Sequence, residues 1–217
     1  MRPGKHEGRS GAQCATPLPG VRQDGGPRPG SAYRLIQVLL VLVVVLSPLA
    51  SFPATLAELL TAFDLAPYPQ NISAPVFSAT TTTGQSVSLT ALQGQVVLLN
   101  FWATWCAECR PELTELEQVH HTLASRGLVV LGVNAGEDIK VIQRYTRNLG
   151  VTFPLLLDPQ QTISRLYGVA GVPTTFLLGR DGRTVALAVS GREWQSPAAQ
   201  RILDALLAEP APPKEGR

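Results

Sequence analysis

Two cysteines separated by two residues, Cys106 and Cys109, stand between an apolar run and an amphipathic run. The apolar run, residues 96–101, is typical of a strand buried on both faces. The amphipathic run has an apolar stripe at helical spacing and ends before Gly127, with the stripe formed by Leu113, Leu116, Val119 and Leu123. A strand that leads through Cys-Xaa-Xaa-Cys into a helix places the thiols on one face, close enough to form a disulfide.

The sequence around this motif alternates short apolar runs with helical patterns. A hairpin around Thr83-Gly84-Gln85 precedes the motif, and a second one turns at Asp181-Gly182. Strands are expected at 76–80, 86–89, 128–133, 153–157, 174–178 and 184–189, and helices at 139–149, 162–167 and from Ser196 or Pro197 to 208. This order predicts an α/β fold in which helices flank a mixed central sheet.

The first quarter of the chain has a different character. Residues 1–34 carry seven glycines and five prolines, with six Lys and Arg against two acidic residues, and predict a disordered basic head that includes Cys14. Residues 35–52 are almost wholly apolar and predict a membrane-spanning signal-anchor with the basic head inside. A cleaved signal peptide remains the alternative. We expect a linker at 53–74, with a short amphipathic piece near 56–63, a folded domain at 75–208 and a disordered tail at 209–217.

Charge and cysteine content exclude several functions for the folded part. Residues 53–217 hold twelve basic and fourteen acidic residues without a basic stripe, which argues against nucleic-acid binding. Three cysteines are too few for a disulfide-stapled scaffold or a four-cysteine zinc site. His120 lies about 16 Å along the expected helix from Cys109, too far to complete a metal site, and both His120 and His121 are expected on a solvated face. We expect neither a metal nor a cofactor.

The chemistry expected of the motif is thiol–disulfide exchange. The helix N-terminus stabilises a thiolate at Cys106, which makes Cys106 the nucleophile. Cys109 lies deeper and attacks the mixed disulfide formed on Cys106. A purely structural disulfide and a metal site remain alternatives.

Residues 100–109, Asn-Phe-Trp-Ala-Thr-Trp-Cys-Ala-Glu-Cys, resemble the active-site segment of the TlpA/ResA-like thioredoxins. The resemblance extends over about residues 75–207 and includes Val172-Pro173-Thr174, which is similar to the family's cis-proline loop. It also includes the 136–158 stretch, which is similar to a central insertion of this branch. The resemblance implies a thioredoxin-like fold with an N-terminal hairpin and that insertion.

The same resemblance implies roles for further residues. Glu112 matches the family's buried glutamate, which accepts or relays the proton of the resolving cysteine; the alternative is a solvated helix glutamate like Glu115 and Glu117. Glu137 matches a second glutamate near the substrate surface; the alternative is a helix-start acid beside Asp138. Trp105, Val172 and Pro173 are expected to bind substrate. Plain thioredoxins carry a buried aspartate where this chain has Asn100.

The implied function is reduction of protein disulfides by a membrane-anchored enzyme on the extracytoplasmic, periplasmic side. Family clients include apocytochrome c and copper-centre assembly proteins, and the electron donor is a membrane-embedded protein of thiol type. Glu108 between the cysteines opposes ionisation of Cys106, and Val172 offers no hydroxyl to a thiolate, so we expect a reducing potential. Pro111, early in the helix, departs from the family pattern.

Two other functions are weighed against this one. A copper-handling or oxidase-assembly module favours a CxxxC motif with a nearby histidine. A peroxiredoxin-type peroxidase requires a proline and a hydroxyl residue where Leu99 and Ala103 stand.

Overall fold

The structure is a computed structural model, and it describes Gly30, Ile36 and residues 55–69 and 72–213. Of the expected basic head, membrane-spanning segment and tail, the structure describes only Gly30, Ile36 and residues 209–213. The rest of these three predicted segments lies outside the described residues. Within the described part of the chain, none of the helices has the length and apolar character needed to cross a membrane. The described residues from 55 onward belong to one compact unit.

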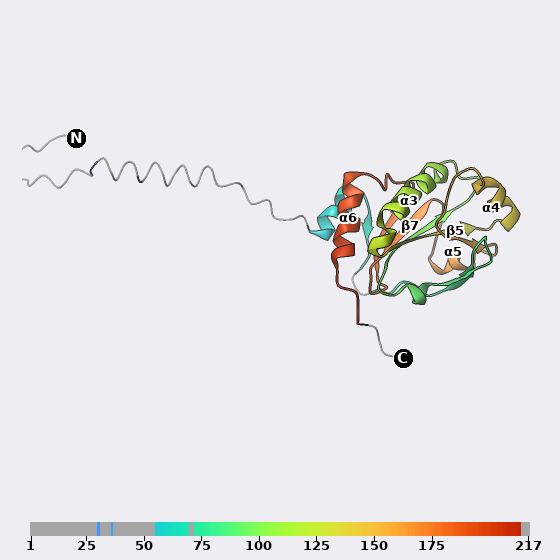
Figure 1. Ribbon diagram of the computed structural model, residues 1–217, viewed down its shortest axis with the longest axis horizontal. Helices are drawn as coiled ribbons and strands as arrows, with labels where there is room; N and C mark the ends of the chain where they lie inside the picture. The colour runs from blue at the N-terminus through green and yellow to red at the C-terminus, as the bar shows by residue number, and fades with distance from the viewer. Residues whose placement is uncertain (1–29, 31–35, 37–54, 70–71, 214–217) are drawn as a thin grey trace, which may run out of the picture. The chain divides into compact units, whose positions relative to one another are not determined.

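A six-stranded mixed sheet forms the centre of this unit, in the order β1-β8-β7-β4-β5-β6 (Figure 1). Strands β4, β5 and β6 run parallel to one another, while β7 lies antiparallel to β4, β8 to β7 and β1 to β8. Their bounds are β1 Ala66–Pro67, β4 Val96–Trp102, β5 Leu128–Ala135, β6 Leu155–Asp158, β7 Thr174–Leu178 and β8 Thr184–Val189. The predicted α/β fold, with helices flanking a mixed central sheet, is confirmed.

Helices cover both faces of the sheet. One face packs against α2 (Leu56–Ala62), α3 (Cys109–Leu123), α4 (Ile139–Thr146) and α6 (Pro197–Ala208), all of which supply residues to one apolar core. Figure 1 shows α6 beside α3, with α4 at the other side of the molecule. The opposite face packs against α5 (Thr162–Leu166) and the 3-10 helix Leu89–Leu92, which contribute to a second core.

Alternation along β4 decides which core each side chain enters. Val97, Leu99 and Phe101 belong to the second core. Val96, Leu98 and Trp102 belong to the first, on the side of α3. Because side chains at i and i+2 share a face of a strand, Asn100 also points toward α3. The strand thus brings a buried polar side chain beneath the helix that follows the cysteine motif.

The expected turns stand where the sequence placed them. The N-terminal hairpin pairs β2 (Ser78–Thr80) with β3 (Ser86–Ser88), as predicted. Gly127 ends the α3 region with a φ of 92°, and Gly182 turns the β7–β8 hairpin with a φ of 80°. Both lie in the left-handed region that favours glycine. Helix α6 starts after Ser196, whose side chain accepts a hydrogen bond from the Ala199 amide.

The expectation of a linker over 53–74 is wrong for the described part of that segment. Residues 55–67, here called the α2 segment, form a capped helix and then edge strand β1, which pairs with β8. Thr55 and Glu58 close a capping box at the start of α2. Leu60 and Leu65 are each 3% exposed and belong to the first core. The segment is therefore integral to the folded domain.

Candidate functional site

Cys106 and Cys109 form a disulfide at the point where β4 leads into α3, with their Cα atoms 5.4 Å apart. The Cys106 amide donates to the Ala103 carbonyl, which turns the chain out of the strand. The Cys109 amide lies 3.1 Å from Cys106 Sγ and donates to it. The predicted pairing of the two cysteines is thus present, with a helix N-terminal amide directed at the first sulfur.

Cys106 is more exposed than Cys109, as expected, but both cysteines are largely buried. Cys106 is 7% exposed and Cys109 is 1% exposed. Helix α3 begins at Cys109, so Cys106 lies in the turn just before the helix and not within its first turn. Trp105, next to Cys106, is 71% exposed. This indole therefore lies on the surface next to the first cysteine in sequence, and its contact with a substrate stays a prediction.

The predicted cis-proline bond is present, and Gly191 lies between it and the cysteine turn. The Val172-Pro173 peptide bond is cis, and Pro173 is buried. Gly191 lies close to both the cysteine turn and the cis-proline. If this glycine carried a Cβ atom, that atom would lie 3.6 Å from the Glu108 carbonyl oxygen and 3.9 Å from Pro173 Cγ. The Ser190 amide also donates to the Pro173 carbonyl at 3.0 Å. The loop of residues 190–196, here called the Trp194 loop, therefore adjoins both the cysteine turn and the proline.

Glu112 is buried, at 2% exposure, one helical turn after Cys109. Its carboxylate accepts hydrogen bonds from Trp194 Nε1 at 2.8 Å and from Asn100 Nδ2 at 3.0 Å, and Thr175 Oγ1 lies at 3.4 Å. Burial raises the pKa of this carboxyl above its ordinary value of 4.5, and the hydrogen bonds from Trp194 and Asn100 offset part of that rise. The alternative of a solvated helix glutamate is wrong for Glu112.

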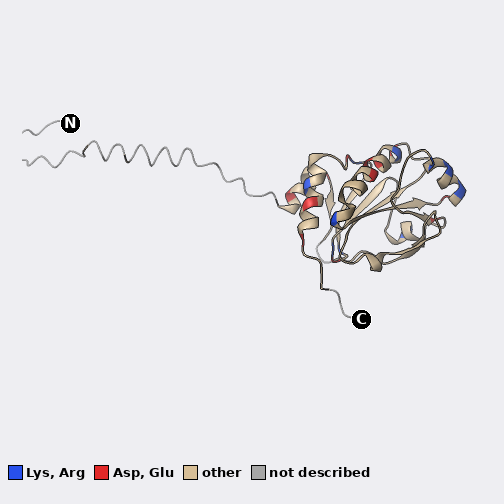
Figure 2. Ribbon diagram, viewed as in Figure 1, with Lys and Arg blue, Asp and Glu red and all other residues tan. Residues whose placement is uncertain are grey.

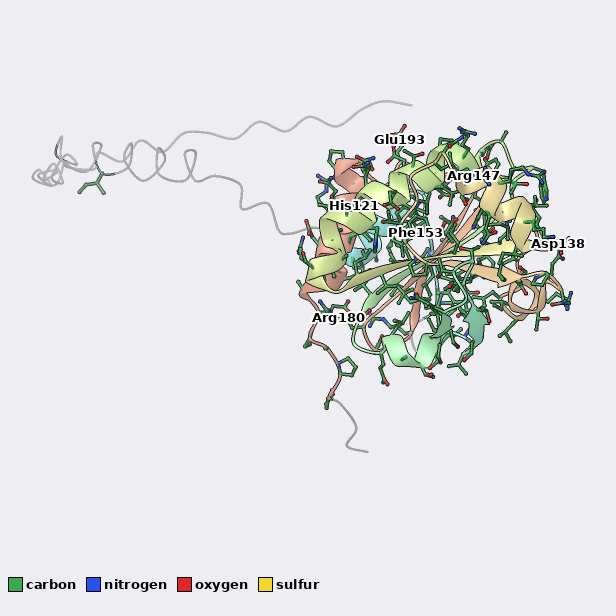
Figure 3. The ribbon with its side chains drawn as sticks, turned by 45° about the vertical axis from the view of Figure 1, so that its right-hand side comes forward. His121, Asp138, Arg147, Phe153, Arg180 and Glu193 are labelled. Atoms are coloured by element: carbon green, nitrogen blue, oxygen red, sulfur yellow. A yellow bond between two sulfur atoms is a disulfide. The ribbon has the colours of Figure 1, made fainter. Side chains whose placement is uncertain are left out.

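A groove of about 530 Å³ runs past this carboxyl group. Helix α3 and the Trp194 loop form its two walls; the residues that line it are Glu108, Pro111, Glu112, Glu115, Ser190, Gly191, Arg192 and Glu193. Figure 3 shows Glu193 at this end of the molecule and Arg180 at the opposite end. The groove gives the otherwise buried Glu112 a side that faces solvent.

Glu137 lies at the end of β5 and holds the loop before the cysteines. Its carboxylate accepts from the Thr104 amide at 2.7 Å and from Asn134 Nδ2 at 2.8 Å. The Thr104 hydroxyl donates to its other oxygen at 2.5 Å. Both carboxylate oxygens of Glu137 therefore accept hydrogen bonds from the protein. These bonds hold Thr104, which lies two residues before Cys106, in place. Contact between Glu137 and a substrate stays a prediction.

Glu117 does not match the solvated helix glutamate that was expected. It is 5% exposed and accepts hydrogen bonds from the amide and hydroxyl of Thr152. Burial raises the pKa of this carboxyl, but hydrogen bonds from Thr152 and Phe153 and the nearby His121 outweigh it, so the pKa lies below its ordinary value. His121 is exposed, as expected for a solvated face, and lies 2.8 Å from Glu117. Glu117 thus fastens the segment before β6 to α3.

Sequence reasoning did not find the Trp194 loop. Trp194 is fully buried and Thr175 is 1% exposed, and both contact Glu112 from positions far along the chain. A tryptophan in a glycine- and charge-containing loop was a usable signal, because buried indole N–H groups usually require a partner. Among the residues described, no group of three or more His, Cys, Asp and Glu is arranged to hold a metal ion.

Comparisons with known proteins match this geometry. Thiol-disulfide oxidoreductase ResA from Geobacillus thermodenitrificans is 34% identical over 111 residues, 51% of this chain and 64% of the relative. ResA from Bacillus subtilis is 35% identical over 112 residues, 52% of this chain and 63% of the relative. The chain thus spans just under two thirds of the length of these relatives.

Solved structures agree. A thiol:disulfide interchange protein of the thioredoxin family from Chlorobium tepidum superposes with a TM-score of 0.58 at 30% identity, covering 65% of this chain and 99% of that one. A secreted Mycobacterium tuberculosis disulfide oxidoreductase homologous to DsbE superposes with a TM-score of 0.53 at 25% identity, covering 59% and 95%. The family model described as the AhpC/TSA family matches residues 71–186, more than half of the sequence. The chain therefore belongs to the AhpC/TSA family, as one of its TlpA/ResA-like members with a thioredoxin fold.

Proposed function

We propose that this chain is a thiol–disulfide oxidoreductase that reduces protein disulfides through Cys106 and Cys109. The observation that carries the proposal is the bonded cysteine pair at the start of α3, near the cis-proline loop and a buried carboxyl group. The ResA relatives carry the same activity in their names. The disulfide present in the structure is then the product state of one reduction.

The reaction proceeds in two exchanges. The Cys106 thiolate attacks one sulfur of a client disulfide, forms a mixed disulfide and releases the other client sulfur as a thiolate. Cys109 then loses its proton and attacks Cys106 Sγ, which breaks the mixed disulfide and releases the second client sulfur. The client gains two electrons and two protons, and the Cys106–Cys109 disulfide forms. A dithiol donor must reverse this oxidation before the next cycle.

Glu112 is the group placed to take the proton of Cys109. It lies on the next turn of the same helix, is held at both carboxylate oxygens, and has a pKa raised by burial. A carboxyl whose pKa is raised toward neutrality accepts and returns a proton more readily at physiological pH than an ordinary glutamate. The groove along α3 supports exchange of that proton with solvent.

Reduction is the proposed direction. Glu108 stands between the cysteines and Glu112 lies beside Cys109, and negative charge at both places disfavours thiolates. The helix N-terminus opposes this by only about 0.3–1 kcal/mol at an exposed site. We expect a potential on the thioredoxin side of the scale after equilibration with glutathione buffers and alkylation. A value near that of the periplasmic oxidant, about −120 mV, would contradict this direction.

The proposed location is the extracytoplasmic face of the cytoplasmic membrane, with residues 35–52 as the anchor. The basic head followed by an apolar run supports this orientation. A secreted Mycobacterium tuberculosis oxidoreductase among the structural neighbours is consistent with it. The proposed clients are protein disulfides, apocytochrome c and copper-centre assembly proteins among them, and the proposed donor is a membrane-embedded thiol protein.

No observation favours the two alternatives. For peroxide chemistry, Leu99 and Ala103 occupy the places of the required proline and hydroxyl residue, and both are fully buried. For copper binding, the motif has two intervening residues where a copper site favours three. Peroxide consumption and copper titration of the reduced protein would detect either activity.

Trapping of clients is the decisive experiment. Cys109→Ser keeps the attacking thiol and removes the resolving one, so clients should accumulate in cells as mixed disulfides with Cys106. Cys106→Ser is the matched control, because it removes the nucleophile and leaves a thiol that is 1% exposed. Equal accumulation in the two variants would contradict the assigned roles, and no accumulation in either would contradict the proposed activity.

A further inference from the structure

The Glu112 carboxyl group is held by a tryptophan that lies far from the cysteine motif in sequence. Trp194 is fully buried in the Trp194 loop, and its indole N–H donates to Glu112 Oε1 at 2.8 Å. Asn100 donates to the other oxygen, and Thr175 lies farther away at 3.4 Å. The indole is therefore the nearer of the two side-chain donors to Oε1, and it comes from a loop and not from the sheet.

In the Trp194 loop, the Trp194 indole is the side-chain donor to Glu112, and the Arg192 backbone amide adds a further hydrogen bond. Glu108, just before α3, and Glu115, on α3, are acidic residues that line the same groove, while β4 and β7 contribute only uncharged Asn100 and Thr175. In the Trp194 loop, Glu193 is also negative. The Arg192 guanidinium donates instead to the carboxylate of Asp64 and to main-chain carbonyls.

The α2 segment in turn holds the Trp194 loop, through the two residues that directly follow helix α2. The Phe63 ring meets the Trp194 indole edge-on, with their centroids 5.6 Å apart. Arg192 Nη2 donates to the Asp64 carbonyl at 3.0 Å and to its carboxylate at 2.9 Å. Two consecutive residues of one segment thus contact two nearby residues of the loop. Phe63 packs on the indole that donates to Glu112, and Asp64 holds the side chain of Arg192, two residues before Trp194.

We propose that Trp194 is a positioning residue, which holds the Glu112 carboxyl group beside Cys109, and that Phe63 holds the Trp194 indole in the orientation this requires. The proposal rests on the proposed function only in giving Glu112 a part in proton transfer. It assigns the α2 segment a place in the redox site, although Phe63 lies 43 residues before Cys106.

The proposal predicts the direction in which the titration midpoint of Glu112 moves when the indole N–H is removed. A hydrogen bond from an N–H group favours the charged form of a carboxyl group. Trp194→Phe removes the N–H and keeps an aromatic ring in the cavity, so Glu112 should retain its proton to higher pH. We expect its titration midpoint to move upward by about one pH unit, the size typical of one charge-assisted hydrogen bond.

The measurement is a carbon-13 NMR titration of the full-length oxidised protein labelled at glutamate side-chain carboxyls. Glu112→Gln identifies the resonance by its absence. The matched control is Trp102→Phe, because Trp102 is equally buried and its Nε1 has no hydrogen-bond partner in the described part of the chain. Trp102→Phe should leave the midpoint of Glu112 in place. An unmoved midpoint in Trp194→Phe, or an equal shift in both variants, would overturn the proposal.

Phe63→Leu tests the second half of the proposal and serves if Trp194→Phe does not fold. It loosens the indole without touching Glu112, and the midpoint should rise by about half a unit. In the Trp194→Phe background the same change should add nothing, because no indole N–H remains to be positioned. An unchanged midpoint in Phe63→Leu, or an equal shift in both backgrounds, would remove Phe63 from the proposal. The titration uses no client, so its outcome is independent of whether the protein reduces client disulfides.

Discussion

At the scale of single residues, the buried acid of this site comes from the helix and not from the strand. Asn100 occupies the strand position where plain thioredoxins carry an aspartate, and it donates a hydrogen bond to Glu112. A second carboxylate at Asn100 would face Glu112 in a buried environment, which two like charges strongly disfavour. The amide therefore suits a site in which Glu112 supplies the titrating group.

The Glu112 carboxyl should leave a signature in the pH dependence of stability. Burial raises its pKa in the folded state above the ordinary 4.5, so its contribution to stability is fully present below 4.5 and is lost as pH rises through the folded-state value. Glu112→Gln removes this dependence. We expect the free energy of unfolding of the unmodified protein, relative to Glu112→Gln, to decrease as pH rises from 4 toward the folded pKa. Urea denaturation of the oxidised proteins across that range measures it, and a flat difference would contradict a raised pKa.

At the scale of elements, periodicity located the strands and helices because each buries a regular apolar face. Strands β7 and β8 and helix α6 begin and end where the sequence placed them, since glycine, a capping serine and a proline mark their ends. The α2 segment was misjudged because three prolines in 53–74 suggested a linker. Its two-residue strand is too short to show alternation, and its helix is held by packing on α6 that no local pattern reveals.

Leu60 distinguishes an integral α2 segment from a linker. It is 3% exposed in the first core, and truncation of a buried leucine costs about 2–5 kcal/mol. We expect Leu60→Ala to lower the free energy of unfolding by an amount in this range. Thr61→Ala, at the neighbouring exposed position, should change it by less than about 0.5 kcal/mol. If urea denaturation showed equally small effects for Leu60→Ala and Thr61→Ala, the segment would behave as a linker and not as part of the domain.

Glu117 predicts a second element-scale effect. Its carboxylate joins α3 to the segment before β6 through the amide and hydroxyl of Thr152. Glu117→Ala leaves these donors without their partner, and we expect a loss of about 1–3 kcal/mol at neutral pH. His121→Ala removes only an exposed pair with Glu117 and should cost less than about 1 kcal/mol. A loss as large in His121→Ala would mean that the ion pair, and not the attachment of the segment, stabilises the helix.

At the scale of the whole molecule, the cysteine motif predicted the chemistry of the site, and the fold added a distant loop that contacts Glu112. The cysteines, Pro173 and Glu112 could be predicted because they lie at fixed spacing or in a short recognisable loop. The Trp194 loop could not, because its contact with Glu112 joins residues 82 positions apart. Figure 2 shows acidic and basic residues on several elements of the described domain.

The uneven charge of the chain leads to a test of its proposed orientation. Six basic residues precede the apolar run at 35–52, while the domain after it has twelve basic and fourteen acidic residues. Positive flanks stay inside, so residues after 52 should lie outside the cytoplasm. A cysteine introduced at Pro213, which is exposed, should then react with a membrane-impermeant thiol reagent in spheroplasts. The background for that variant carries serine at the three native cysteine positions.

Cys14 provides the matched control for this labelling. Restored alone in the same serine background, it lies in the basic head and should react only after the cells are lysed. Labelling of Pro213→Cys only after lysis would reverse the proposed orientation. Labelling of both positions in intact spheroplasts would mean that residues 35–52 do not hold the head inside. With the domain outside, as proposed, a disulfide reductase needs its electrons carried across the membrane, because the reducing thiol systems lie within the cytoplasm.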